Sequence, residues 1–94
     1  MRRFYNSTDA IRFGRAHRHD HRARAEVVFS MRAYQSQARA LRGLSGPSET
    51  MKAEEVSASQ QAGFCREALE AIDGAHDNVE QLKEKVQPKG EKHG

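Results

Sequence analysis

The chain has 94 residues, a formal net charge of +3 and a pI of about 9.4. This length allows one domain at most, and only 36% of the residues are hydrophobic, so a single chain has a thin core. No stretch approaches the roughly 20 apolar residues of a membrane-spanning helix, so we expect no membrane partner. We expect a partner chain or self-association to add to the core.

The charges divide the sequence into two halves of opposite sign. Residues 1–46 hold ten arginines and three acidic residues, a net charge of +7, whereas residues 47–94 hold six basic and ten acidic residues, a net charge of −4. Between the halves, the segment Gly43 to Ser48 contains two glycines and a proline, which is typical of a turn. The sequence therefore predicts two arms whose charges attract each other.

Apolar residues recur at helical spacing in both halves, from Phe13 to Leu41 and from Met51 to Val86. We predict an all-α protein, a long antiparallel helical hairpin that occupies residues 9–87 with its turn at residues 43–48. Residues 1–8 are predicted to form an irregular basic lead-in, and residues 88–94 a flexible tail. Asp20 falls on the packed face, so we expect the first arm to break there, with Asp20 capping a new helix.

A turn centred near residue 46 determines which residues of the two arms face each other, because both helices rise equally per residue. Facing residues then have numbers that sum to about 92, which pairs Val27 with Cys65. The same register places Arg24 near Glu67 and Arg42 near Glu49. Exposed ion pairs contribute only about 0.2–1 kcal/mol each, so they select the register more than they add stability.

A second row of small and apolar side chains lies beside the packed face of each arm. A two-helix hairpin leaves these rows exposed, so we expect a dimeric helical bundle or a partner protein to cover them. The alternative is that the alanines in these rows are only good helix formers. The predicted protein interface consists of Val28, Phe29, Ala33, Phe64, Ala68 and Ala71.

The residues Leu44-Ser45-Gly46 and the length of the arms resemble the small Trp-x-Gly secretion-substrate hairpins of Gram-positive bacteria. That family consists of two-helix hairpins that dimerise, so the resemblance implies a dimer here. Leu44 stands where the family has its defining tryptophan, and the tail lacks the family's aromatic-plus-acid export signal. The similarity is therefore confined to the fold.

Arginines in the first half form a candidate contact surface for acidic groups. Arginine binds phosphate and carboxylate groups in a bidentate manner, so this surface suits a nucleic acid or an acidic partner. No recognised nucleic-acid-binding motif accompanies it, and the alternative is that the acidic second arm neutralises it internally. This arginine row consists of Arg12, Arg15, Arg18 and Arg22, preceded by Arg2 and Arg3.

No combination of residues indicates catalysis or metal binding. His17 and His21 have the i,i+4 spacing of helical zinc ligands beside Asp20, but His76 is the only distant candidate for a further ligand. We therefore interpret the histidines as a solvated patch. Cys65 falls on the packed face and is predicted to be buried and unreactive. We expect no catalytic residue, no metal and no cofactor.

Together these features predict a non-enzymatic helical interaction protein that binds a protein partner or self-associates, as a regulator, an inhibitor or an accessory subunit. The alternative is nucleic-acid binding through the arginine row, with an affinity that falls steeply with salt. The single cysteine favours an intracellular, reducing compartment such as the cytoplasm. A mitochondrial location is the alternative, because the Arg-rich, acid-poor start has the composition of a transit peptide.

Overall fold

A computed structural model describes residues 1–44 and 48–74 of the chain. Over these residues the chain forms three helices, α1 (Ser7–Ala16), α2 (His21–Gly43) and α3 (Glu49–Ile72), and no strand. The predicted all-helical fold is therefore confirmed for the described part of the chain. None of the three helices is long and apolar enough to cross a membrane.

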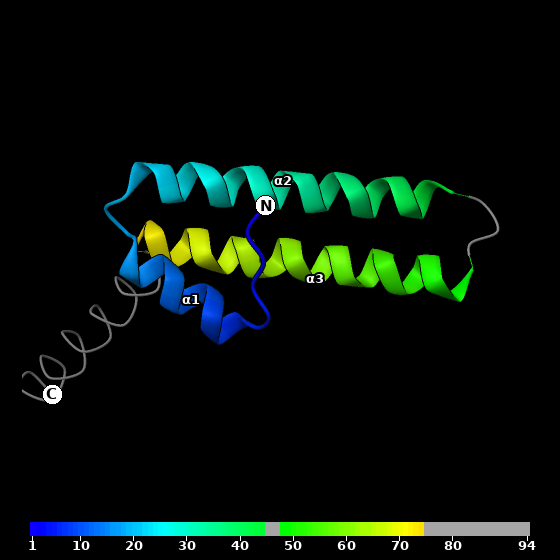
Figure 1. Cartoon of the computed structure of the whole chain (residues 1–94), viewed down its shortest axis with the longest axis horizontal. Helices are drawn as coiled ribbons and strands as arrows, with labels where there is room; N and C mark the ends of the chain where they lie inside the picture. The colour runs from blue at the N-terminus through cyan, green and yellow to red at the C-terminus, as the bar shows by residue number, and fades with distance from the viewer. Residues whose placement is uncertain (45–47, 75–94) are drawn as a thin grey trace, which may run out of the picture.

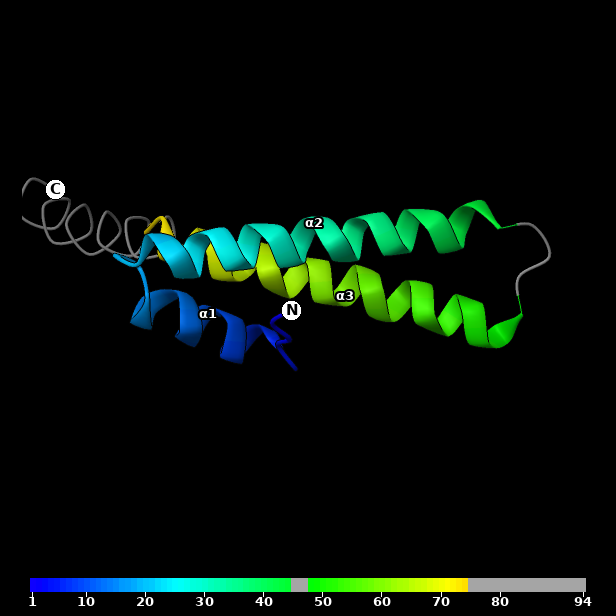
Figure 2. The same ribbon diagram turned by 45° about the horizontal axis from the view of Figure 1, so that its top comes forward.

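The three helices are arranged around α3. Helices α2 and α3 lie side by side and run in opposite directions (Figure 1). Helix α1 folds back along the C-terminal half of α3 instead of extending the line of α2 (Figures 1 and 2). The first half of the chain therefore contacts α3 through two separate helices, and α3 lies between them.

Asp20 separates α1 from α2, because its side chain caps the second of these helices. Its Oδ1 accepts hydrogen bonds from the backbone N–H groups of Arg22 (2.9 Å) and Ala23 (3.3 Å), which have no partner within the helix. The predicted helix start at Asp20 is thus observed. In α1 the cap is Asn6, whose Oδ1 accepts from the N–H of Asp9 (2.8 Å), so the first helix begins earlier than residue 9.

Helix α3 begins after Ser48, whose Oγ accepts a hydrogen bond from the N–H of Met51 (3.2 Å), and it ends at Ile72. Gly74 then adopts a φ of 78°, a left-handed conformation that glycine reaches without steric cost. The predicted second arm is therefore interrupted at Gly74. Its continuation to residue 87, and the predicted tail at residues 88–94, lie outside the described residues.

Residues 1–6 cross the α2–α3 pair and supply part of the core. Phe4 is only 4% exposed, and its ring centroid lies 5.5 Å from that of Phe13 on α1. The N–H of Phe4 donates to Oε1 of Gln61 on α3 (3.3 Å), and the hydroxyl of Tyr34 on α2 donates to the carbonyl of Arg2 (3.3 Å). This lead-in segment thus connects all three helices.

The ion pairs between α2 and α3 differ from those that the predicted register gives. Arg24 binds Asp73 (2.9 Å), and Arg42 binds Glu55 (2.7 Å). In both cases the acidic partner lies six positions later in the chain than predicted, and Asp73 is the residue directly after α3. Side chains lean toward the N-terminus of their own helix, so the long arginines of α2 reach residues that come later in the antiparallel α3.

Cys65 is fully buried in the core cluster with Val27, as the sequence predicts. Burial raises the pKa of the Cys65 thiol from 9.0 to about 11, because the apolar surroundings disfavour the charged thiolate. Above pH 9.0 the unfolded chain therefore ionises this thiol, whereas the folded chain keeps it protonated until about pH 11. The contribution of the neutral thiol to stability is present below pH 9.0 and is lost as the pH rises toward 11.

We therefore expect stability to fall more steeply with alkaline pH in the wild-type protein than in Cys65→Ala. The free energy of unfolding is measured by urea titration at several pH values from about 8 to 11, and the two proteins are compared at each pH. Groups common to both proteins cancel in this comparison. Parallel pH profiles would contradict the burial of the thiol.

Candidate functional site

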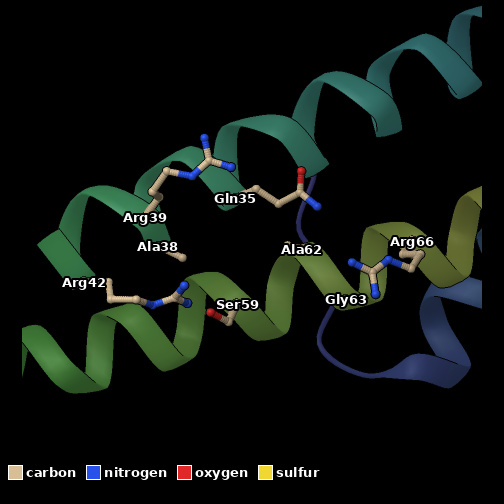
Figure 3. A pocket seen from close by; sticks show the side chains of 8 residues that line it. All are labelled: Gln35, Ala38, Arg39, Arg42, Ser59, Ala62, Gly63 and Arg66. Atoms are coloured by element: carbon tan, nitrogen blue, oxygen red, sulfur yellow. The ribbon is translucent and has the colours of Figure 1, made fainter.

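The α2–α3 pair has one covered side and one open side. The lead-in segment and α1 pack on the covered side, where Phe4 is buried. On the open side a groove of about 350 Å³ runs between the two helices (Figure 3). Eight residues line it: Gln35, Ala38, Arg39 and Arg42 of α2, and Ser59, Ala62, Gly63 and Arg66 of α3.

The floor of the groove is made of small side chains. Ala38 and Ala62 are each 5% exposed and close the bottom of the groove, where the two helices meet. A Cβ atom added at Gly63 would have no neighbour within 4 Å, so the space above this glycine is open. The groove floor, defined as Ala38, Ser59, Ala62 and Gly63, therefore leaves room for another backbone to approach closely.

Three arginines form the rim of the groove. Arg39 and Arg42 come from successive turns of α2, and Arg66 comes from α3. Arg42 and Arg66 extend toward each other along the groove, with Ser59 between them, while Arg39 lies along α2 (Figure 3). This arginine rim gives the groove a concentration of positive charge above an uncharged floor.

Only one member of the arginine rim is neutralised within the described part of the chain. Nε of Arg42 donates to Oε1 of Glu55 at 2.7 Å. Arg39 and Arg66 make no hydrogen bond or ion pair with any residue that the structure describes, and both are exposed. Two guanidinium groups of like charge thus remain beside the same groove, and an anionic group placed there would relieve their repulsion.

Two carboxylates contributed by α3 and by the residue after it are paired with arginines of α2. Glu55 is paired with Arg42. Directly after α3, Asp73 accepts two hydrogen bonds from Arg24, at 2.9 Å and 3.1 Å. This bidentate pair raises the pKa of the Arg24 guanidinium, through the hydrogen bond and the charge of Asp73. These two carboxylates therefore neutralise Arg24 and Arg42 and leave the other two members of the arginine rim as the charged groups lining the groove that no described residue neutralises.

The structure divides the predicted interface between exposed and buried positions. On α2, Phe29 is 68% exposed, and Val28 and Ala33 are partly exposed. On α3, Phe64 is partly buried and packs against the core cluster. The two halves of the predicted interface are therefore not equally accessible.

Helix α1 of the same chain covers the remaining two interface positions. Ala68 and Ala71 are 0% and 1% exposed, and both lie against Gly14 of α1. The small-residue row on α3 was expected to meet a second chain, but here it receives an intramolecular helix. The reason is that Gly14 has no side chain and so lets α1 approach the α3 backbone closely.

The predicted arginine row does not form one helical face. Arg12 and Arg15 lie on α1, Arg18 lies between the helices, and Arg22 lies in the first turn of α2. These positions belong to separate elements because α1 ends at Ala16 and the chain then reverses direction.

Arg2 and Arg3, which precede this row, belong to the lead-in segment. The guanidinium of Arg2 lies 4.2 Å from the ring centroid of Phe13, and its Nε lies 3.2 Å from Oε1 of Glu26. Arg3 borders a smaller hollow of about 110 Å³ on the covered side, together with Tyr34 and Gln61. Arg2 therefore acts within the fold.

The histidine patch lies mainly in the link between α1 and α2. Nδ1 of His17 is 3.9 Å from Oδ2 of Asp20, and the ring of His17 contacts that of Phe13 with centroids 4.4 Å apart and the planes tilted by 33°. His21 is exposed at the start of α2. Within residues 1–44 and 48–74, no three side chains of the metal-binding types gather around a common point.

Sequence reasoning did not identify the groove. Arg39 and Arg66 belong to neither predicted set, although Arg39 and Arg42 are one helical turn apart and Arg66 is the only arginine of the acidic half. These two signals were available in the sequence. Comparison with known proteins found no matching family model, no matching curated protein and no matching solved structure.

Proposed function

We propose that this chain is a non-enzymatic interaction protein that binds a protein partner in the groove between α2 and α3. The observation that carries the proposal is an open groove with a small-residue floor and two rim arginines, Arg39 and Arg66, that no described residue neutralises. Such a protein would act by occupying a surface, as a regulator, an inhibitor or an accessory subunit. The buried single cysteine, Cys65, suits a reducing compartment.

The shape of the groove favours a macromolecule over a small ligand. Small-molecule sites are usually enclosed and bury most of the ligand surface. Here the hollow is open between about two turns of each of two antiparallel helices, and its floor is shallow because its residues are alanine, serine and glycine. A shallow trough between two helices is the surface on which a further helix packs in helical bundles.

The charges favour a protein partner over a nucleic acid. A nucleic-acid backbone carries phosphates at regular intervals and requires a long positive surface. The arginine row is divided among α1, the link and α2, and of the rim arginines Arg42 is already paired with Glu55. Farther along the α2–α3 pair, Arg24 is paired with Asp73, so these two arginines offer a phosphate backbone no free positive charge.

Self-association is a second candidate, and the exposure of Phe29 favours it. A phenylalanine that is 68% exposed on the outer face of α2 leaves a large apolar side chain in water. Val28 and Ala33 flank it and are partly exposed. A homodimer of this kind would use the α2 half of the predicted interface, because α1 already covers Ala68 and Ala71 of the α3 half.

Size-exclusion chromatography with light scattering tests these alternatives on wild type and Phe29→Ser. We expect a monomer of 10.6 kDa in both proteins, with a protein-like ratio of absorbance at 260 and 280 nm. The chain has no tryptophan and two tyrosines, so bound nucleic acid would dominate the absorbance. A dimer that dissociates in Phe29→Ser would support self-association instead. Nucleic acid that salt removes would contradict the proposal.

A further inference from the structure

We infer that the groove accepts an acidic helix of a partner protein, whose carboxylates bind the arginine rim and whose small residues pack on the groove floor. This inference rests on the proposed function, because it names the class of partner for the same groove. Two features of the groove indicate an acidic helix, the small side chains of the floor and the positive charge of the rim.

The floor indicates the shape of the occupant. Packed helices lie about 8–10 Å apart, and the lower values require small residues at the contact. Ala38 and Ala62 provide such residues on the groove floor, one from each helix, and Gly63 leaves open space beyond its Cα. An extended peptide would have no sheet edge to pair with here, because the neighbouring backbone is helical and its N–H and C=O groups are bonded within α2 and α3.

The rim indicates the charge of the occupant. Arg39 and Arg42 are three residues apart on α2, so their side chains emerge from adjacent turns. Carboxylates spaced by three or four residues on a partner helix have the same separation and can meet both. Arg66 stands on the opposite wall and can bind a carboxylate on the other flank of that helix.

Arg39 and Arg66 are expected to determine the affinity. Arg42 already donates to Glu55, so a partner carboxylate would have to share it. Arg39 and Arg66 have no competing acceptor among the described residues. Each can therefore form a charge-assisted hydrogen bond to the partner without breaking an existing one.

Fluorescence anisotropy with a synthetic peptide tests the inference. The probe is a fluorescein-labelled peptide of about 20 residues with Glu at i,i+4 spacing on one face. Alanine, the strongest helix former, fills the other positions to offset the repulsion between the glutamates. The same peptide with Gln in place of every Glu is the control for charge. A labelled single-stranded DNA of similar length tests the nucleic-acid alternative.

Three variants locate the binding surface. Arg39→Glu with Arg66→Glu reverses the two unpaired rim charges. Arg12→Glu with Arg22→Glu makes the same change in net charge outside the groove, at two exposed positions. Gly63→Leu fills the floor and keeps every arginine, and leucine favours helix more than glycine does. Circular dichroism checks that each variant keeps its helices.

We expect the Glu peptide to bind the wild-type protein and the Gln peptide not to bind. The groove double variant and Gly63→Leu should each weaken binding about tenfold or more, and the control double variant by less than about threefold. Equal weakening by both double variants, or full affinity in Gly63→Leu, would overturn the inference. So would the lack of any binding to the wild-type protein. None of these outcomes changes the oligomeric state measured by light scattering, which tests the proposed function separately.

The DNA probe separates failure of the inference from failure of the proposed function. DNA that binds more tightly than the Glu peptide and is released by the groove double variant would show that the groove holds nucleic acid. That result would overturn both. Weak DNA binding that the control double variant reduces as much as the groove variant would be non-specific, and it would leave the inference standing.

Discussion

Replacing Phe4 by alanine is expected to lower the free energy of unfolding by about 3–5 kcal/mol, the usual range for a buried phenylalanine. Phe4 is 4% exposed and belongs to the core cluster, although it lies in the irregular segment before α1. Its ring packs near Phe13 of α1, and its N–H binds Gln61 of α3. Truncation therefore removes a contact that several elements share.

Urea titration followed by circular dichroism measures this loss, with Tyr5→Ala as the matched control. Tyr5 is the next residue and is 82% exposed, so its truncation should change stability by less than about 0.5 kcal/mol. A domain of this size has about 5–15 kcal/mol of stability, so Phe4→Ala should be close to unfolding at moderate temperature. Similar, small effects for both variants would show that the lead-in segment does not dock on the helices.

Replacing Gly14 by alanine is expected to destabilise the protein by about 1–3 kcal/mol, even though alanine is the better helix former. A Cβ atom at Gly14 would collide with the carbonyl oxygen of Ala68 and would lie 2.5 Å from the Cβ of Ala71. The backbone of α3 cannot yield as a flexible side chain would. Helix α1 must therefore move away from α3 and expose the alanines that it covers.

The same substitution at Gly63 is expected to change the stability of the protein in the opposite direction. Gly63 lies inside α3, and a Cβ there would have no neighbour within 4 Å. Alanine should therefore stabilise the protein by up to about 1 kcal/mol through helix propensity alone. Thermal melts of Gly14→Ala and Gly63→Ala measure both effects. Stabilisation by both substitutions would contradict the packing of α1 on α3.

Features that depend on local chemistry could be predicted from the sequence. A carboxylate is unfavourable on a packed helix face, so the sequence predicted that the helix breaks at Asp20 and restarts there. In the structure the Asp20 side chain does cap α2. The burial of Cys65 followed from helical periodicity. Both signals act within a few residues or repeat along one helix, so a single sequence contains them.

The position of α1 could not be predicted in the same way. The row that includes Ala68 and Ala71 was predicted to be covered by a second chain, and α1 of the same chain covers it. A small-residue row does not specify which helix approaches, and a second chain was the expected one. The decisive partner, Gly14, reads in the sequence as a weak position in a helix, and its role is visible only when α1 lies against α3.

The groove was missed for a related reason. A charged binding site is formed by the side chains that have no partner of opposite charge within the protein. Identifying these side chains requires the correct register between the two helices, because the register determines which ion pairs form. The predicted register gave Arg24 and Arg42 other partners than Asp73 and Glu55. It also gave the arginine row acidic neighbours along an arm that keeps its direction past the break at Asp20, and the chain instead reverses direction after Ala16.

Site-specific photocrosslinking at the groove tests the central claim most directly. A benzophenone amino acid replaces Gln35, which lines the groove, or the adjacent Ser36, which is exposed and shares its helical face with Phe29. The experiment is done in cells that naturally produce the chain, and adducts are identified by mass spectrometry. We predict a discrete adduct with another protein from position 35 and none from position 36. An adduct from position 36 alone, or none from either position, would contradict binding in the groove.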